Sequence, residues 1–237
     1  MKLKIVAISD LDGNSPDIIE SADIALIPGD IVPLAVQFNN PGSKEWLETT
    51  FANWVNNLPV DAVFLTAGNH DAYFESITNT KLQSFLSKCN GKLKYLKNET
   101  VTYFDENGLD WTIFGTPYCH IYGNWPFMRS DEYMTEKFKE IPDKVDIIMS
   151  HDPPFAVSDV DVILDSSRRP ILDYKHLGNP PLANRINNVN YKLLVCGHIH
   201  GGDHQYDSWW KTVNVSYLNE GYRPHYKPFY TEIEHDL

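Results

Sequence analysis

The sequence contains few cysteines, and their arrangement does not suggest a structural role. There are three, Cys89, Cys119 and Cys196, an odd number without a CxxC spacing. Disulfide frameworks of small secreted domains use even numbers of cysteines, so we expect reduced thiols in a cytoplasmic protein. Cys119 followed by His120 could supply two zinc ligands, although a lone Cys-His pair is more often structural or incidental.

The sequence also lacks a long apolar run. The apolar stretch near Met1 ends at Asp10, and no small-residue cleavage site follows it, which argues against a signal peptide. Nothing elsewhere approaches the roughly 20 apolar residues that a membrane-spanning helix needs. We therefore expect no membrane partner.

Basic residues are scarce, with 20 Lys and Arg against 32 Asp and Glu and a formal net charge of −12. Binding to duplex DNA depends on Lys and Arg that neutralise phosphates, so the balance argues against a nucleic-acid partner. No repeat, low-complexity run or Pro/Gly/Ser-rich linker divides the chain, and residues 1–237 are expected to form a single domain. The oligomeric state is left open.

What the sequence does contain is a set of five polar clusters, each placed directly after an apolar run. The clusters are Asp10-Leu11-Asp12, Gly29-Asp30, Gly68-Asn69-His70-Asp71, His151-Asp152 and Gly197-His198-Ile199-His200. The runs before them are typical of strands buried on both faces; they cover 4–8, 24–27, 62–65, 147–149 and 193–195. Because open α/β sheets bind ligands beyond the carboxyl ends of their strands, the pattern predicts a two-metal site at one sheet edge.

Taken singly, each cluster has a simpler explanation. Asp10 after a strand is most often a turn or helix-cap residue, Gly29-Asp30 is a common turn pair, and an isolated His151 is more often hydrogen-bonded than a ligand. Recurrence at five separate strand ends favours the metal site over these alternatives. If the last cluster continues a strand, His198 and His200 point to the same face.

The rest of the chain alternates strands and helices early and is mainly β later. Helices are expected over 16–21, 44–57, 81–89, 132–140 and 182–188, and further strands over 96–104, 111–115, 211–215 and 228–233. Residues 156–180, which include Arg168 and Arg169, are expected to form a long loop. This order indicates two sheets packed face to face with helices outside.

These motifs resemble those of the calcineurin-like metallophosphoesterases, whose pattern runs D-x-H, G-D, G-N-H-D/E, a lone H and G-H-x-H. The resemblance extends from Asp10 to His200 with the motif order kept. It implies an α/β fold of the four-layer αββα type, with two mixed β-sheets packed face to face. The segments 115–117, 150–154 and 196–201 look most like the small cytosolic phosphodiesterase branch.

The resemblance also implies roles for individual residues. The metal ligands would be Asp10, Asp12, Asp30, Asn69, His151, His198 and His200. Asp30 would bridge the two metals, and His70, oriented by Asp71, would be the catalytic acid. Two divalent ions, with Mn²⁺ expected ahead of Fe, Zn, Mg or Ni, would supply a bridging hydroxide. The substrate would be a small phosphate monoester or diester, such as a nucleotide.

Asp12 departs from this pattern, because the family usually has histidine there. A carboxylate suits Mn²⁺ or Mg²⁺ better, while histidine favours Zn²⁺. Direct ligation, ligation through water, a weakly filled first site and a plain turn with Gly13 all stay open. The departure also leaves room for a binding scaffold that has lost catalysis. A nuclease of the same superfamily is a further alternative, against which the acidic balance argues.

An aromatic cluster follows residue 117 and has two open interpretations. Its members are Tyr118, His120, Tyr122, Trp125 and Phe127. The cluster could stack against a base of the substrate, or it could form a small hydrophobic core under a loop. Arg168 and Arg169 could bind a second phosphate or remain solvated.

Overall fold

The computed structural model describes residues 1–164, 170–201 and 204–236, with only the backbone described for 160–164 and 170–174. Arg168 and Arg169 lie outside the described residues. The first of two five-stranded sheets has the order β12-β1-β2-β3-β4. Its strands are β1 (Lys2–Ala7), β2 (Ile24–Pro28), β3 (Ala62–Thr66), β4 (Leu93–Tyr95) and β12 (Phe229–Glu234). Strands β1 to β4 are parallel and β12 is antiparallel to β1, so this sheet is mixed.

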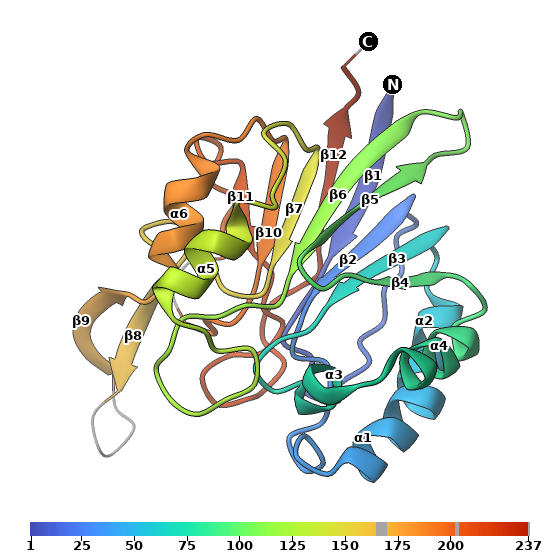
Figure 1. Cartoon of the computed structure of the whole chain (residues 1–237), viewed down its shortest axis with the longest axis horizontal. Coiled ribbons are helices and arrows are strands. Elements are labelled where there is room, and N and C mark those ends of the chain that lie inside the picture. Colours follow the sequence, from blue (N-terminus) through green and yellow to red (C-terminus); the bar gives the residue numbers. More distant parts are fainter. Residues whose placement is uncertain (165–169, 202–203, 237) are drawn as a thin grey trace.

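The second sheet has the order β11-β10-β7-β6-β5. Its strands are β5 (Glu99–Phe104), β6 (Asp110–Thr116), β7 (Ile147–Ser150), β10 (Leu193–Cys196) and β11 (Thr212–Asn214). Only the pair β5 and β6 is antiparallel, so this sheet is mixed as well. A separate antiparallel pair, β8 (Val160–Leu164) and β9 (Pro170–His176), extends from the body of the molecule (Figure 1).

Helices cover the outer face of each sheet. On the β3 and β4 side lie α1 (Asn40–Trp46), the π-helical segment Leu47–Phe51, α2 (Ala52–Asn57), α3 (Ala72–Ser76) and α4 (Asn79–Lys88) (Figure 1). On the β7 and β10 side lie α5 (Asp131–Phe138) and α6 (Pro180–Ile186). The N-cap side chains Thr78, Ser130 and Asn179 accept backbone hydrogen bonds and begin α4, α5 and α6.

Alternation of side chains along the strands divides the core into layers. In β1, Leu3, Ile5 and Ala7 face the space between the sheets, where they meet the β6 residue Trp111 and the β3 residue Phe64. Val6 and, just after the strand, Ile8 belong to the core on the outer side, under the helices, whereas Lys4 is exposed. This is the period of two that a strand covered on both faces requires. The predicted α/β architecture, with two mixed sheets face to face and helices outside, is confirmed.

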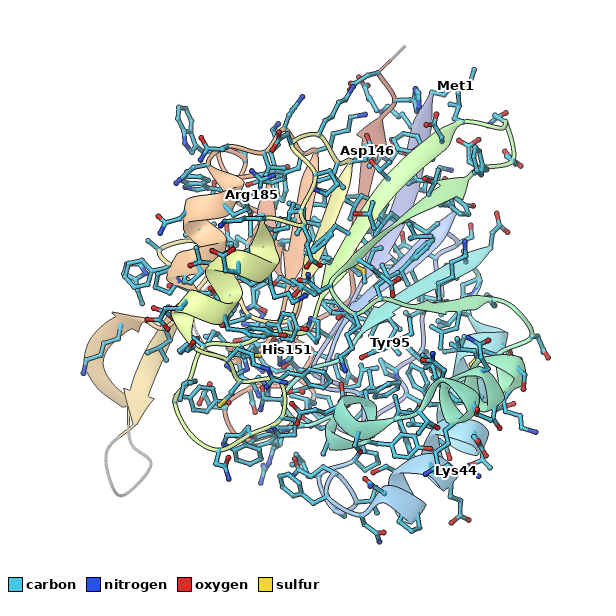
Figure 2. All side chains as sticks on the ribbon, viewed as in Figure 1. Met1, Lys44, Tyr95, Asp146, His151 and Arg185 are labelled. Atoms are coloured by element: carbon cyan, nitrogen blue, oxygen red, sulfur yellow. The ribbon has the colours of Figure 1, made fainter. Side chains whose placement is uncertain are left out.

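The parallel strands end at one edge, and that edge carries the polar clusters. Figure 2 shows Asp146 and His151 at the two ends of β7, with His151 on the side remote from Met1. Chain direction therefore brings the residues after the parallel strands of each sheet to one edge of that sheet. The face-to-face packing of the sheets brings the two edges together, since β1, β2 and β3 belong to the first sheet and β7 and β10 to the second.

Three expected elements differ from the structure. Residues 16–21 form no helix; the segment is fixed instead by a 2.9 Å hydrogen bond from Trp54 Nε1 to the Pro16 carbonyl. Only residues 99–104 of the strand expected over 96–104 form β5, because residues 96–98 cross from the first sheet, which the chain leaves after Tyr95, to the second. Asn98, with a φ of 56°, lies in this crossover. The expected loop 156–180 contains β8 and β9.

Among the described residues, no helix is long and apolar enough to cross a membrane.

The contact between the sheets yields a stability prediction. Phe64 is fully buried there and packs edge-on against Tyr103 at 5.9 Å between ring centroids. We expect Phe64→Ala to lower the free energy of unfolding by about 3–5 kcal/mol in urea denaturation, because a large cavity would remain. Phe104→Ala, at a position 66% exposed at the outer end of β5, should change it by less than about 0.5 kcal/mol. Equal losses would contradict the assigned layer.

Candidate metal centre

The structure brings the five polar clusters together at one edge. Donor atoms of Asp10, Asp30 and His151 all lie within 4.8 Å of one another, although their clusters follow β1, β2 and β7. All three side chains are buried. The convergence is therefore present, but it lies at the adjoining edges of two sheets and not at the single sheet edge that the sequence predicted. Asp10 and Asp30 follow strands of the first sheet, and His151 follows a strand of the second.

Local backbone geometry explains how short turns direct these side chains inward. Asp10, Asp12, Asp30 and His198 have φ values of 52°, 41°, 52° and 70°. Few residues other than glycine adopt this left-handed region, and aspartate does so more readily than most. His198 and His200 thus lie in a turn after β10, which ends at Cys196, and the expected continuation of the strand is wrong. The turn arises because Gly197 and His198 bond to residues outside the sheet.

Asp10 is the most heavily engaged carboxylate. Its oxygens accept hydrogen bonds from Ser9, from Ser216 Oγ at 2.8 Å and from the His198 backbone amide at 3.0 Å. His200 Nε2 lies 3.2 Å from Asp10 Oδ1. Burial alone would raise the pKa of Asp10, but the hydrogen bond and charge of His200 outweigh it and hold the pKa well below its ordinary value.

Asp30 lies at the centre of the cluster. Its Oδ1 accepts the His70 backbone amide at 2.7 Å, and its Oδ2 lies 3.3 Å from His151 Nε2. Burial opposes ionisation, yet the charge of His151 dominates and lowers the pKa of Asp30 to about 2. A Cβ at Gly68 would stand 2.6 Å from His151 Nε2 and closer still to Asp30, so only glycine fits beside this pair.

His151 and Asn69 form the adjacent part of the centre. His151 Nδ1 lies 2.7 Å from the Pro28 carbonyl, which orients the ring, and Nε2 lies 3.0 Å from Asn69 Oδ1. A ring fixed through one nitrogen with the other facing donor oxygens is the usual arrangement of a metal-ligating histidine. Burial would lower the pKa of His151, but the charge of Asp30 raises it to about 10.

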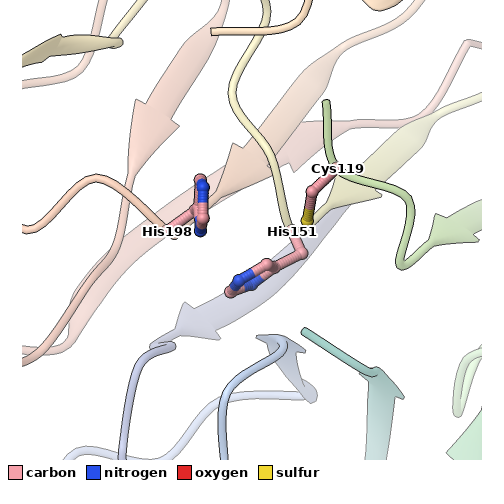
Figure 3. Close-up of side chains that lie close together, drawn as sticks. All are labelled: Cys119, His151 and His198. Carbon is pink, nitrogen blue, oxygen red and sulfur yellow. The ribbon is translucent and has the colours of Figure 1, made fainter. Parts of the chain in front are cut away.

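His198 completes a second group of donors. Its donor atoms lie within 4.8 Å of those of His151 and Cys119, and Figure 3 shows the three side chains converging. Burial lowers the pKa of His198 to about 4, which leaves the neutral ring that a metal ligand requires. Cys119 thus groups with His151 and His198, and His120 is not a member of that group. His120 Nδ1 lies 2.8 Å from Asp152 Oδ2.

Asp12, where the sequence departs from the pattern, contacts His70. His70 Nδ1 lies 2.9 Å from Asp12 Oδ1, while the buried Asp12 Oδ2 has no hydrogen-bond partner. Burial raises the pKa of Asp12 to about 6. Burial acts in the opposite sense on His70, but the charge of Asp30 and the hydrogen bond to Asp12 raise the pKa of His70 to about 9.

The expected orientation of His70 by Asp71 is wrong. Asp71 Oδ1 accepts the backbone amides of Ile31 and Val32 at 3.0 Å, and its Oδ2 accepts that of Gly68 at 2.8 Å. Both oxygens are thereby used by backbone, and Asp12 takes the place at the His70 ring. Asp71 instead ties the turn after β2 to the turn after β3.

The donor set fits a pair of divalent cations. Buried carboxylates are costly unless paired, and the partnerless Asp12 Oδ2 is the kind of atom that an ion would satisfy. Oxygen and imidazole donors together suit Mn²⁺, Fe²⁺ or Zn²⁺. The residues that could hold them are Asp10, Asp12, Asp30, Asn69, His151, His198 and His200.

Some members of the aromatic cluster belong to the hydrophobic core and others line the cavity, so each of the two interpretations holds for part of the cluster. Tyr118 and Phe127 are buried in the core, whereas Tyr122 and His120 line a cavity of about 340 Å³ over the centre. Tyr222 lines the same cavity, and sequence reasoning missed it. It follows β11 in a segment without a motif, so no local signal pointed to it.

Two mixed sheets that carry buried carboxylates and imidazoles at one edge define an α/β protein of the metallophosphoesterase type. The family model of the calcineurin-like phosphoesterases matches residues 3–202, so the chain belongs to that family.

Individual relatives are distant. The chain is 26% identical over 230 residues to metallophosphoesterase domain-containing protein 1 of Homo sapiens, covering 86% of this chain and 65% of that protein. It is 28% identical over 205 residues to probable rhamnogalacturonate lyase C of Emericella nidulans, covering 84% of this chain and 17% of that protein. The chain thus spans less than two thirds of these relatives. One crystal structure, 15% identical, matches the fold with a TM-score of 0.59 over 92% of this chain and 91% of that chain.

The contact between Asp12 and His70 leads to a prediction. In metal-free protein, Asp12→Asn should lower the pKa of His70 from about 9 toward its ordinary value, because the charged hydrogen-bond acceptor is lost. An NMR pH titration of the ring protons measures this shift. His120, whose partner is Asp152, serves as an internal control and should titrate unchanged. An unchanged His70 would show that Asp12 does not support its charge.

Proposed function

We propose that this protein is a hydrolase that cleaves small phosphate esters with two divalent metal ions. The observation that carries the proposal is the convergence of Asp10, Asp30 and His151 donor atoms within 4.8 Å, beside the partnerless oxygen of Asp12. A purely structural role does not require so many buried ionisable groups at the adjoining edges of the two sheets.

Each half of the centre has its own ligands in this proposal. The first cation would be held by Asp10, Asp12 and His200, the second by Asn69, His151 and His198, and Asp30 would serve both. Bound divalent cations would lower the pKa of water and neutralise charge that develops on the phosphoryl oxygens. The three carboxylates favour Mn²⁺ over a purely zinc-binding centre.

His70 is proposed as the proton donor to the leaving oxygen. Its Nδ1 is engaged with Asp12 and its ring lines the cavity. In the metal-free protein the charge of Asp30 and the hydrogen bond to Asp12 raise its pKa to about 9. The ring is further held between Trp125, at 5.2 Å, and Tyr222, at 6.0 Å between ring centroids. A fixed imidazolium can deliver its proton without reorganisation of the site.

Turnover tests this function directly. Metal-free protein should hydrolyse neither a nitrophenyl phosphate monoester nor a nitrophenyl diester, and added Mn²⁺ should restore hydrolysis of at least one. Asp30→Asn should lose binding of both ions, measured by metal analysis, together with activity, because both cations would share its charge. The control Asp146→Asn, at the end of β7 opposite to His151, should retain both ions. No turnover with any divalent metal would favour the scaffold instead.

Replacement of His70 tests the proton donor. His70→Ala should keep both metal ions yet lose roughly 10²–10⁴-fold in kcat on an alkyl phosphate ester. The loss should be much smaller on a nitrophenyl ester, since that leaving group barely needs a proton. Equal losses on both esters would contradict the acid role and indicate a role in positioning.

A further inference from the structure

Two exposed tyrosines border the cavity over the metal centre and have no role in the proposed ligand set. Tyr122 is 52% exposed and Tyr222 is 47% exposed, and both line the cavity of about 340 Å³. Single exposed aromatic side chains are ordinary on a protein surface. Two exposed aromatic side chains that line the same cavity are a more specific indication of a binding site.

The two rings lie over different halves of the centre. The Tyr122 ring is 5.3 Å from that of His198, which belongs to the proposed second-metal group. The Tyr222 ring is 5.2 Å from that of His200 and stacks at 6.0 Å on His70. A phosphate held at the centre would therefore have an aromatic ring on each side of its ester group.

Tyr222 is held in place by an unusual turn. Its φ of 55° is rare for a bulky side chain, and such conformations persist where the surroundings enforce them. The Asn219 carbonyl accepts the Tyr222 amide at 2.8 Å and also lies 3.2 Å from His200 Nδ1. One backbone group thus positions both the tyrosine and a proposed ligand.

Tyr122 is presented by a loop whose other aromatic residues are mostly inward. Tyr118 and Phe127 are buried, and the loop is closed by hydrogen bonds from the Cys119 amide to Phe127 and from the Arg129 amide to Cys119. His120 anchors it further through Asp152. Within this firmly closed loop, Tyr122 is left extending over the cavity.

We propose that Tyr122 and Tyr222 bind a planar aromatic group of the substrate, so that the protein selects aryl or nucleoside phosphate esters over alkyl ones. This inference rests on the proposed function. Aromatic faces attract planar rings in a way that tolerates different bases, since every base has a π-face. The cavity is within the size range of small-molecule sites.

The test compares ligands that differ only by the ring, on Mn²⁺-loaded protein. Phenylphosphonate and methylphosphonate share a head group and are not cleaved, so calorimetry measures their binding without turnover. Tyr122→Leu and Tyr222→Leu should each weaken phenylphosphonate binding by roughly 5- to 100-fold, the range for loss of one stacking ring, and methylphosphonate binding by less than about twofold. The kcat/KM for AMP against that for ribose 5-phosphate, both of them esters, extends the comparison to turnover and distinguishes a nucleobase from a simple aryl group.

Two controls separate stacking from other effects. Tyr122→Phe and Tyr222→Phe keep the rings and should bind phenylphosphonate within about twofold of the parent protein. Phe104→Leu removes a ring that is 66% exposed at the end of β5 remote from the metal centre, and it should not change phenylphosphonate binding. Equal losses for both phosphonates, or equal losses in the Phe and Leu variants, would overturn the proposal.

Failure of catalysis has a different signature. If no ester is hydrolysed but phenylphosphonate still binds in a manner that depends on the tyrosines, the aromatic site stands and the hydrolase proposal fails. If the Leu variants hydrolyse each ester, aryl or alkyl, with the same kcat/KM as the parent protein, the hydrolase proposal stands and the aromatic site is overturned.

Discussion

Electrostatic repulsion among three buried carboxylates is the constraint that the rest of the structure has to satisfy. Asp10, Asp12 and Asp30 lie at one sheet edge, mostly hidden from water, where ionisation is unfavourable without a nearby positive charge. In the metal-free protein that charge comes from imidazoles, which is why His70, His151 and His200 have raised pKa values. Divalent cations would meet the same requirement more strongly, and the whole arrangement of turns serves to keep these groups together.

Backbone contacts maintain this arrangement against its own electrostatic cost. Asp71 binds amides on both sides of the gap between the turns after β2 and β3, and the His70 amide binds Asp30. The absence of a side chain at Gly68 lets the Asp30 and His151 side chains approach. The motif residues therefore fall into two groups: Asp30 and His151 contribute donor atoms to the candidate site, whereas Asp71 fixes the turns that present them. Residue type alone did not reveal this role of Asp71.

The elements that sequence reasoning anticipated share a physical basis. Buried strands such as β2 and β7 are continuous apolar runs, and their ends are marked by residues that favour turns, so the strands and the polar residues at their ends could be predicted. The meeting of Asp30 and His151 depended in addition on the packing of the first sheet against the second. The antiparallel pairing of β8 with β9 and the crossover between the sheets at Asn98 could not be predicted. Pairing partners and crossovers between sheets depend on contacts that are distant in sequence. Residues 16–21 failed as a helix for the same reason, since a contact with Trp54 fixes them.

Local pattern and chain direction by themselves determined which groups lie at the carboxyl edge of each sheet, because parallel strands in one sheet end on the same side whatever the loops do. The packing of the two sheets then joined these edges into one candidate metal centre. Only the tertiary structure decided how those groups are partnered. Asp12 and not Asp71 contacts the His70 ring. His198 lies in a turn after its strand, with its donor atoms close to those of His151. Tyr222, from a segment without a motif, lines the cavity. Each of these depends on where a turn places a side chain to within about an ångström, and hydrogen bonds to distant backbone set that position.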